Sequence, residues 1–293
     1  DKVIEQISEL GAMAPLHNPA HVLAIKACLK TFGDKIPQVV VFDTSFHQTM
    51  PAKAYMYALP YEYYEKYGVR KYGAHGTSHH FVSDRAAALM GKDKKDLKII
   101  TCHLGNGCSI TAVKDGMCVD TSMGFTPLDG FMMGTRSGSL DPSALTYIAE
   151  KENLSPADIN TICNKKSGVF GISGVSNDNR DVAAAAEKGN KRAALAIEMQ
   201  RYQILKFVGS YVAAMNGVDV IAFTGGIGEN DPELREYVCE NLSFLGIKID
   251  SEKNKLRGRE VKISTDDSKA AVFVIPTNEE LAIARDTLSK VNK

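Results

Sequence analysis

Three apolar runs rich in β-branched residues follow one another in the middle of the chain, and they constrain its fold more than any other feature. The runs cover residues 97–105, 108–113 and 117–122. Asp115 and Gly116 stand between the last two runs, and both residue types accept the backbone of a tight hairpin turn. We therefore expect three successive strands of one sheet.

Helices and strands alternate after these runs. A helical pattern with one wide apolar stripe spans residues 191–215, and it leads into apolar runs at 218–226 and 270–276. Another β-branched run, 37–43, ends in Asp43 and is typical of a buried parallel strand. Strands that alternate with helices indicate an α/β protein, in which ligands bind at the carboxyl edge of the sheet.

Capping residues predict where two further helices begin. Ser78 is expected to cap a helix that Gly91 closes. Near the end of the chain, Thr277 and Glu280 have the spacing of a capping box, which predicts a helix that starts after Thr277.

The composition is that of an ordinary globular protein, and it excludes several functions. A length of 293 residues suggests about two domains, and the 35 basic residues balance the 35 acidic ones. No net field therefore favours nucleic acid or an anionic membrane. The six cysteines form no Cys-x-x-Cys pair, which predicts reduced thiols, a cytoplasmic location and no zinc site. No apolar stretch is long enough to span a bilayer, and the chain opens without a signal-peptide core.

Two glycine-rich turns could approach a phosphate group. They cover residues 103–107 and 224–230, each at the end of an expected strand. Glycine lets backbone N–H groups approach a ligand, and a helix that follows the turn favours negative charge at its start. A simple turn without a ligand explains either stretch taken alone. The P-loop and G-x-G-x-x-G fingerprints are absent from the sequence.

Four polar residues near these turns could take part in chemistry. His75 and Arg136 lie among small residues. Asp43 ends an expected strand, and Glu279 begins an expected helix. Each also has a structural explanation, as a satisfied histidine, a solvated arginine or a helix-dipole carboxylate. Together they suit phosphoryl transfer, which needs cationic stabilisation and a divalent metal held by one or two carboxylates.

The chain resembles the acetate kinases over essentially its whole length. The resemblance rests on short stretches that occur here in the same order as in that family: APLHNP (14–19), VFDTSFHQTMP (41–51), YGAHGTSH (72–79), HLGNG (103–107), DTSMGFTPL (120–128), MGTRSG (133–138), FTGGIGEN (223–230) and IPTNEE (275–280). Acetate kinases belong to the superfamily of sugar kinases, Hsp70 chaperones and actin. The resemblance implies a duplicated ribonuclease-H-like (actin-like ATPase) fold with the active site between two domains.

This resemblance also implies an activity and the residues that carry it. The enzyme would be a phosphotransferase that moves the γ-phosphoryl group of ATP to the carboxyl group of acetate. It would form acetyl phosphate and ADP reversibly, with Mg²⁺ or Mn²⁺. The catalytic residues would be Asp43, His75 and Arg136, and Glu279 would bind the metal. Contacts to the nucleotide would come from His103, Leu104, Gly105, Asn106, Gly107, Asp178, Asn179, Arg180, Gly226, Ile227, Gly228, Glu229 and Asn230. The acyl pocket would be lined by Leu16, His17, Ala74 and Pro127.

The opening of the chain departs from the family pattern. Acetate kinases begin with a strand and an Asn-x-Gly-Ser-Ser-Ser-x-Lys phosphate turn, which this sequence lacks. We therefore expect residues 1–44, with 281–293 returning to them, to be the remnant of a largely missing first domain. Residues 45–280 would form the complete, nucleotide-binding domain.

Other functions stay open beside acetate phosphorylation. Ala74 stands where some relatives carry phenylalanine, which favours some activity with propionate. A propionate or butyrate kinase and an inactive truncated nucleotide-binding member of the superfamily are the alternatives. A homodimer is expected from the resemblance alone.

Overall fold

The computed structural model describes residues 2–12, 18–33 and 36–292. Contacts divide the chain into two units, which are Asp1–Val41 with Ile283–Lys293, and Phe42–Ala282. The expected boundaries were 44/45 and 280/281, and the assignment of the two parts to two ribonuclease-H-like domains stays a prediction.

The smaller unit contains helices and a segment, residues 36–41, that forms neither helix nor strand. It contains α1 (Lys2–Glu9), the short 3₁₀ turn η1 (Leu10–Ala12) and α2 (Asn18–Phe32). Ile7 and Val22 are its buried residues.

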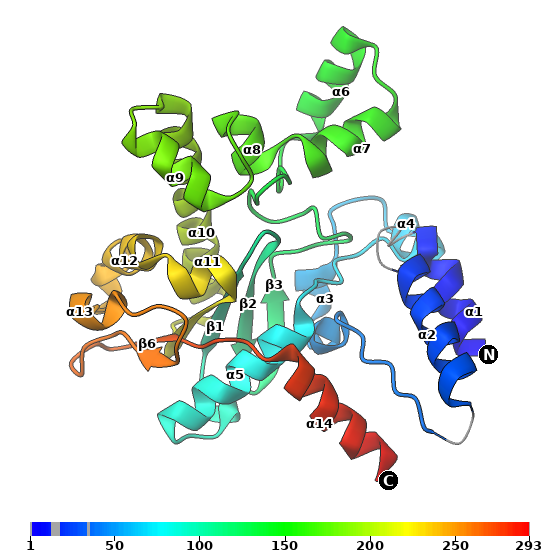
Figure 1. Cartoon of the computed structure of the whole chain (residues 1–293), viewed down its shortest axis with the longest axis horizontal. Coiled ribbons are helices and arrows are strands. Elements are labelled where there is room, and N and C mark those ends of the chain that lie inside the picture. Colours follow the sequence, from blue (N-terminus) through cyan, green and yellow to red (C-terminus); the bar gives the residue numbers. More distant parts are fainter. Residues whose placement is uncertain (1, 13–17, 34–35, 293) are drawn as a thin grey trace. The chain divides into compact units, whose positions relative to one another are not determined.

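A six-stranded mixed sheet forms the centre of the larger unit, in the order β3-β2-β1-β4-β6-β5 (Figure 1). The strands are β1 (Ile99–Leu104), β2 (Cys108–Lys114), β3 (Met117–Thr121), β4 (Val220–Thr224), β5 (Val261–Lys262) and β6 (Ala271–Val274). β1 runs antiparallel to β2 and parallel to β4. Asp115 and Gly116 have φ values of 55° and 77°, as the predicted hairpin requires. The three expected strands and the hairpin are confirmed.

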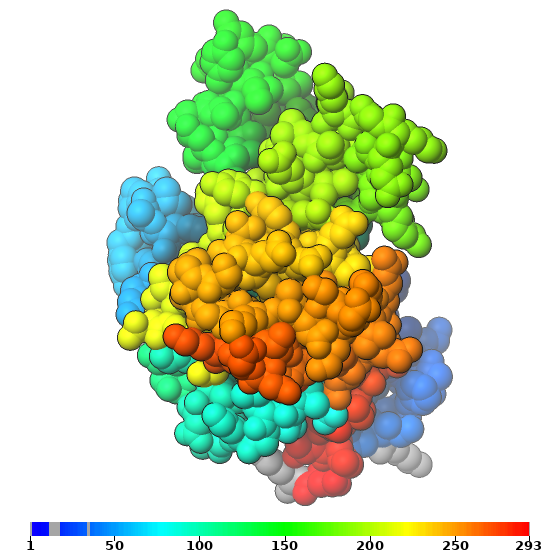
Figure 2. Space-filling model, turned by 90° about the vertical axis from the view of Figure 1, so that its left-hand side faces the viewer, coloured from blue at the N-terminus to red at the C-terminus, as the bar shows by residue number. Residues whose placement is uncertain are grey.

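Helices cover both faces of this sheet, with α5 on one face and α10 and α12 on the other. The helices and short 3₁₀ turns after residue 42 are η2 (Ser45–Thr49), α3 (Ala52–Tyr55), α4 (Glu62–Tyr67), α5 (Gly76–Met90), η3 (Lys94–Asp96), α6 (Pro142–Glu152), α7 (Pro156–Lys165), α8 (Gly168–Ser173), α9 (Asn179–Glu187), α10 (Lys191–Met215), α11 (Gly225–Asn230), α12 (Pro232–Glu240), η4 (Ser243–Leu245), α13 (Ser251–Asn254) and α14 (Glu279–Val291). Most of α14 belongs to the smaller unit. Figure 2 shows α6 and α7, in green, as a lobe at one end of this unit. The described part of the chain contains no helix of the length and apolarity that a membrane crossing needs.

Two apolar layers hold the sheet between its helices. Ile100, Cys102 and Leu104 of β1 belong to a core that also includes buried residues of α10 and α12. On the other face, Ile99 joins a core with Val82 and its neighbours in α5. A sheet that is buried on both faces is the arrangement expected of an α/β protein, and this prediction is confirmed.

The run 37–43 is not the buried strand that its composition predicts. Residues 36–42 form no strand, and Val40 and Phe42 are 41% and 47% exposed. A strand needs a neighbour to pair its backbone groups, and no segment of the described chain pairs with this run. Asp43 therefore follows a segment without regular secondary structure instead of a sheet strand.

The capping residues predicted for two helices are also wrong. Helix α5 begins at Gly76, so Ser78 lies inside its first turn, although Gly91 closes it as expected. Helix α14 is capped by Asn278, whose side-chain Oδ1 accepts from Leu281 N at 2.9 Å. Ser78 donates to the Oγ1 atom of Thr277 at 2.8 Å. Both predicted caps therefore serve a tertiary contact instead of a helix end.

Candidate active site

One face of the sheet changes from apolar to polar toward the carboxyl end of β1. On the side that packs against α5, β1 presents Ile99 and then Thr101 and His103. The paired strand β2 also carries a polar residue at this end, because its Ser109 lies opposite His103. Thr101 and Ser109 are fully buried. Because buried polar groups need partners, this end of the sheet is built for a hydrogen-bonded cluster.

Asp43 fixes the start of α5 above this cluster. Its carboxylate accepts from His75 N at 2.5 Å and from Thr77 N at 3.2 Å, and its backbone oxygen accepts from Gly76 N at 2.9 Å. A carboxylate at a helix N-terminus satisfies open N–H groups and complements the helix dipole. His75 itself has a φ of 57°, which is uncommon for a residue with a side chain. These contacts hold the His75 ring in place.

The His75 ring lies between the sheet and a second histidine. Its Nδ1 atom is 2.8 Å from the Ser109 hydroxyl oxygen. Its plane stacks on the His103 ring, with ring centroids 4.2 Å apart and planes inclined by 20°. His103 in turn bonds the Ser78 hydroxyl through Nδ1 at 2.8 Å. The structure therefore brings together two of the predicted residues, His75 and His103.

Arg136 meets His75 at the glycine-rich turn. A Cβ atom placed on Gly107 would lie 3.2 Å from Arg136 Nη1 and 3.5 Å from His75 Nε2. The guanidinium and the imidazole thus face the same stretch of backbone. Arg136 Nη1 also donates to the Pro127 oxygen at 3.3 Å, which places the predicted acyl-pocket residue beside it. Burial lowers the pKa of Arg136, but an arginine stays charged in a protein.

Asn106 links this turn to two neighbouring loops. Its backbone oxygen accepts from Gly134 N at 3.2 Å, in the loop that carries Arg136. Its side-chain oxygen accepts from Asn177 Nδ2 at 3.4 Å, directly before Asp178. A Cβ atom on Gly134 would clash with Asn106 Oδ1, so a larger residue there would displace the Asn106 side chain. The turn 103–107 therefore joins the catalytic candidates to the expected nucleotide contacts.

The remaining predicted nucleotide residues lie on helices α9 and α11. Asp178 caps α9 and forms an exposed ion pair with Arg180 at 2.6 Å. Asn179 donates to Gln200 Oε1 at 2.8 Å. The helix α11 holds Gly226, Ile227, Gly228, Glu229 and Asn230 directly after β4. The side chain of Leu104 is fully buried in the core, so it is not presented to a ligand.

Two acidic groups approach each other near His75. Burial, and then the charge of Asp43, raise the pKa of Glu279. The two carboxylates therefore lie close enough for their charges to repel each other. Among the described residues, no group of three or more His, Cys, Asp or Glu side chains could hold a metal ion by itself.

The structure describes two of the four residues predicted to line the acyl pocket. Leu16 and His17 lie outside the described residues. Ala74 packs against the main core, and its backbone oxygen bonds His47 Nε2 at 3.0 Å. Pro127 contacts Arg136 as described above.

Sequence reasoning missed the polar residues beneath His75. These are His47, His79, Thr101 and Ser109, together with Ser78, which was expected only as a helix cap. A usable signal was present, because β1 and β2 each carry polar residues at alternate positions within otherwise apolar runs.

Three of the clustered histidines are held neutral. Burial lowers the pKa of His47 to about 4 and that of His103 to about 4. Burial and then the neighbouring histidines lower the pKa of His79 well below its ordinary value. These rings are therefore uncharged at neutral pH, which makes the folded state sensitive to acid.

We expect the free energy of unfolding to fall as the pH drops from 7 to 5. The unfolded chain binds protons at a pKa near 6.5, whereas folded His47 and His103 bind them only near 4. The stabilisation is therefore complete above about pH 6.5, and about 2 kcal/mol per histidine is lost by pH 5. Urea unfolding at both pH values measures the change. His47→Gln should reduce the difference, and an unchanged pH dependence in that variant would refute the assignment.

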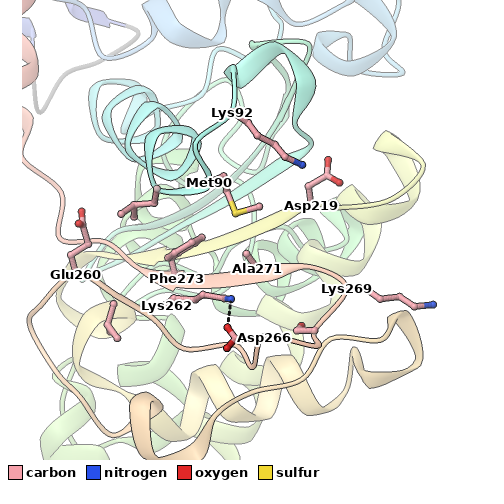
Figure 3. A pocket seen from close by; sticks show the side chains of 12 residues that line it. Met90, Lys92, Asp219, Glu260, Lys262, Asp266, Lys269, Ala271 and Phe273 are labelled. Carbon is pink, nitrogen blue, oxygen red and sulfur yellow. Dashed lines mark hydrogen bonds and ion pairs between the residues drawn. The ribbon is translucent and has the colours of Figure 1, made fainter.

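A pocket in the surface lies away from these residues. It has a volume of about 590 Å³, opens beside the start of β6 and is lined by Met90, Asp219 and Phe273 among others (Figure 3). Lys262 pairs with Asp266 at 2.9 Å across it. No predicted site residue lines this pocket. Asp219 and Ala271 stand at the amino ends of their strands, whereas the His75 cluster lies at the carboxyl end of β1.

Comparisons with known proteins match the chain over nearly its whole length. The Acetokinase family matches residues 1–285. An acetate kinase from Halothermothrix orenii is 58% identical over 287 residues, which cover 98% of this chain and 72% of the relative. The crystal structure of Porphyromonas gingivalis acetate kinase matches with 52% identity and a TM-score of 0.95, over 98% of this chain and 72% of that one. A propionate kinase from Francisella tularensis matches with 49% identity and a TM-score of 0.89, over 96% and 71%.

Proposed function

The chain belongs to the acetokinase family, and on this premise we propose that it transfers the γ-phosphoryl group of ATP to acetate. An acetate oxygen forms a bond to the γ-phosphorus while the bond to the bridging oxygen of ADP breaks, which gives acetyl phosphate and ADP. The reverse reaction uses the same groups. The observation that carries the proposal is that Arg136 Nη1 and His75 Nε2 face the same glycine, Gly107.

Arg136 and His75 would stabilise the transferring group. A phosphoryl group in transit spreads negative charge over three oxygens, so fixed donors and cations lower its energy. Arg136 supplies a permanent positive charge, and His75, directly before α5, supplies a ring nitrogen. Both are already oriented, Arg136 by Pro127 and His75 by Asp43 and Ser109. Such preorganised groups cost no rearrangement when the reaction occurs.

The nucleotide would lie along the two glycine-rich segments. The turn 103–107 would contact the phosphates through its backbone. A Cβ atom placed on Gly226, in α11, would have no atom within 4 Å, and this room suits the close approach of a flat base or a ribose. Asp178, Asn179 and Arg180 would contact the adenosine end. Asn106 supports this assignment, because it joins the phosphate turn to Asn177.

Asp43 and Glu279 fit a divalent cation that is shared with the nucleotide. Oxygen ligands are what Mg²⁺ prefers, and it is commonly held by one or two carboxylates together with substrate phosphates. The raised pKa of Glu279 beside Asp43 supports the fit, because a cation would relieve the repulsion of the two charges. When bound, the ion would neutralise charge on the phosphates. Mn²⁺ has similar ligand preferences.

The direct test is acetate-dependent formation of ADP from Mg-ATP. We expect ADP to appear only when acetate is present, and hydroxylamine to trap the product as acetyl hydroxamate. Equal ADP formation with and without acetate would refute the transfer. That result would instead favour a nucleotide-binding or nucleotide-hydrolysing member of the same superfamily.

We expect the chain to phosphorylate propionate as well as acetate. The small Ala74 supports this, as does the likeness to a propionate kinase. A pocket discriminates one methylene by about 1–3 kcal/mol, so kcat/KM for propionate should be about 10- to 200-fold lower. Parallel assays with acetate, propionate and butyrate measure the ratio. A complete lack of turnover at high propionate concentration would remove this second activity.

The homodimer and the cytoplasmic location stay predictions. The six cysteines are free thiols, and all except Cys28 are buried, which agrees with a reducing compartment. Light scattering of the purified protein would give the molar mass in solution.

A further inference from the structure

A single file of hydrogen bonds runs from the interior of the sheet to the His75 ring. Thr101 Oγ1 lies 2.7 Å from His79 Nδ1, and His79 Nε2 lies 2.7 Å from Ser109 Oγ. Ser109 Oγ then lies 2.8 Å from His75 Nδ1. Thr101, His79 and Ser109 are fully buried. Water therefore does not replace any link in this file.

The file has two continuous orderings, because each of its hydroxyls and each neutral ring has one hydrogen. A mixed ordering, in which both rings donate to Ser109, would leave the hydrogen of the buried Ser109 hydroxyl without an acceptor in the described chain. In the first ordering, Thr101 donates to His79 Nδ1, His79 Nε2–H donates to Ser109, and Ser109 donates to His75 Nδ1. In the second, every donor points the other way.

The two orderings differ at the buried end. In the second ordering, Thr101 would accept from His79, and its own hydrogen would need another acceptor. Within the described chain, Thr101 Oγ1 has no other hydrogen-bond partner. A buried donor without an acceptor costs free energy, so the first ordering is the stable one. Thr101 thus sets the direction of the whole file.

We propose that Thr101, His79 and Ser109 are positioning residues that keep His75 as the neutral tautomer with its hydrogen on Nε2. This inference rests on the proposed function, because Nε2 faces Gly107 and Arg136, where the phosphoryl group would pass. Ser109 occupies Nδ1 as a donor, so His75 must carry its hydrogen on the other nitrogen. His75 then acts as a fixed hydrogen-bond donor, and Arg136 supplies the positive charge.

The surroundings of His79 agree with this role. The titratable groups that face its ring are His47, His75 and His103, at centroid distances of 5.8, 6.5 and 6.2 Å. Burial lowers the pKa of His79, so the ring stays neutral and keeps a single hydrogen. A charged His79 would have two donors and would lose the direction that Thr101 imposes.

The tautomers can be read directly from the unmodified protein. We expect ¹⁵N NMR of the histidine rings at neutral pH to show His79 and His75 both protonated at Nε2, with Nδ1 as the acceptor. His79 protonated at Nδ1 would overturn the proposal, whatever the activity. This spectrum requires no turnover. A protein that lacks acetate-dependent activity but shows these tautomers would refute only the proposed function.

Ser109→Ala tests the effect on turnover, with Thr111→Val as a matched control. Ser109→Ala should lower kcat about tenfold and leave KM for ATP within about twofold, and the His75 signal should become a mixture of tautomers. Thr111 lies on the same strand, is equally buried and bonds Thr121 instead of the file. Its variant should keep kcat and the His75 tautomer. Equal kcat in both variants, or an unchanged His75 tautomer in Ser109→Ala, would overturn the proposal.

Thr101→Val and Thr101→Ser test the distant end of the file. The valine variant keeps the shape of the side chain but removes its hydroxyl, whereas the serine variant keeps the hydroxyl. We expect a mixed His75 tautomer in Thr101→Val and the wild-type tautomer in Thr101→Ser. The same spectrum in both variants would contradict a direction set by Thr101.

Discussion

Arg136→Ala should lower kcat by about 10³-fold or more, while the Kd for Mg-ADP changes by less than about threefold. An arginine that stabilises a phosphoryl group in transit contributes mostly in the transition state, and its loss costs about 10³- to 10⁵-fold. The position of Arg136 Nη1 at Gly107, beside His75 Nε2, places its charge at that group. Steady-state kinetics with calorimetric nucleotide binding measures both effects.

Arg85→Ala is the matched control for loss of an arginine. Arg85 pairs with Glu260 at 2.6 Å, and Glu260 lines the distant pocket beside β6. The control variant should therefore keep kcat within about twofold, because this exposed ion pair contributes little to stability and Glu260 lines a pocket without predicted site residues. Equal losses of turnover and nucleotide affinity in Arg136→Ala would show that Arg136 binds the ground state instead of the transition state.

Gly76→Ala should destabilise the fold by about 1–3 kcal/mol, because a side chain there collides with backbone. A Cβ atom on Gly76 would clash with the Asp43 backbone oxygen. The Asp43 carboxylate would then lose its bonds to His75 N and Thr77 N. A shift of about 1 Å in a catalytic group costs about 100-fold in rate, so we also expect kcat to fall by about that factor. Thermal unfolding and initial rates measure the two losses.

Gly209→Ala is the control for this substitution. Gly209 lies inside α10, and its Cβ would have no atom within 4 Å. Alanine should therefore stabilise the fold by about 0.4–1 kcal/mol and leave kcat unchanged. Wild-type stability and turnover in Gly76→Ala would show that Asp43 does not depend on this close contact.

The sheet and its helices could be predicted because their patterns are local. β1, β2 and β3 follow from three apolar runs and from Asp115–Gly116, and α10 follows from one long apolar stripe. These signals act within a few residues of each other. The strand predicted for residues 37–43 is wrong because the composition is typical of a strand, but a strand also requires a neighbouring strand to pair with.

Several residues of the candidate site could be predicted from the sequence, but the contacts between them could not. His75, Arg136 and Gly107 were named individually, whereas their approach depends on the fold. Ser78 was interpreted as a helix cap from the local sequence, whereas its actual partner, Thr277, lies 199 residues away. The file from Thr101 to His75 likewise joins β1, β2 and α5. Contacts of this kind become visible only when strands and helices are placed in space.

We propose that His75 and Arg136 together hold a phosphoryl group at the turn that contains Gly107. A crystal structure of the protein with Mg-ADP, acetate and aluminium fluoride tests it most directly, because the fluoride complex imitates the transferring group. We predict that the aluminium fluoride lies within hydrogen-bond distance of both His75 Nε2 and the Arg136 guanidinium. An aluminium fluoride that contacts neither side chain would contradict the account.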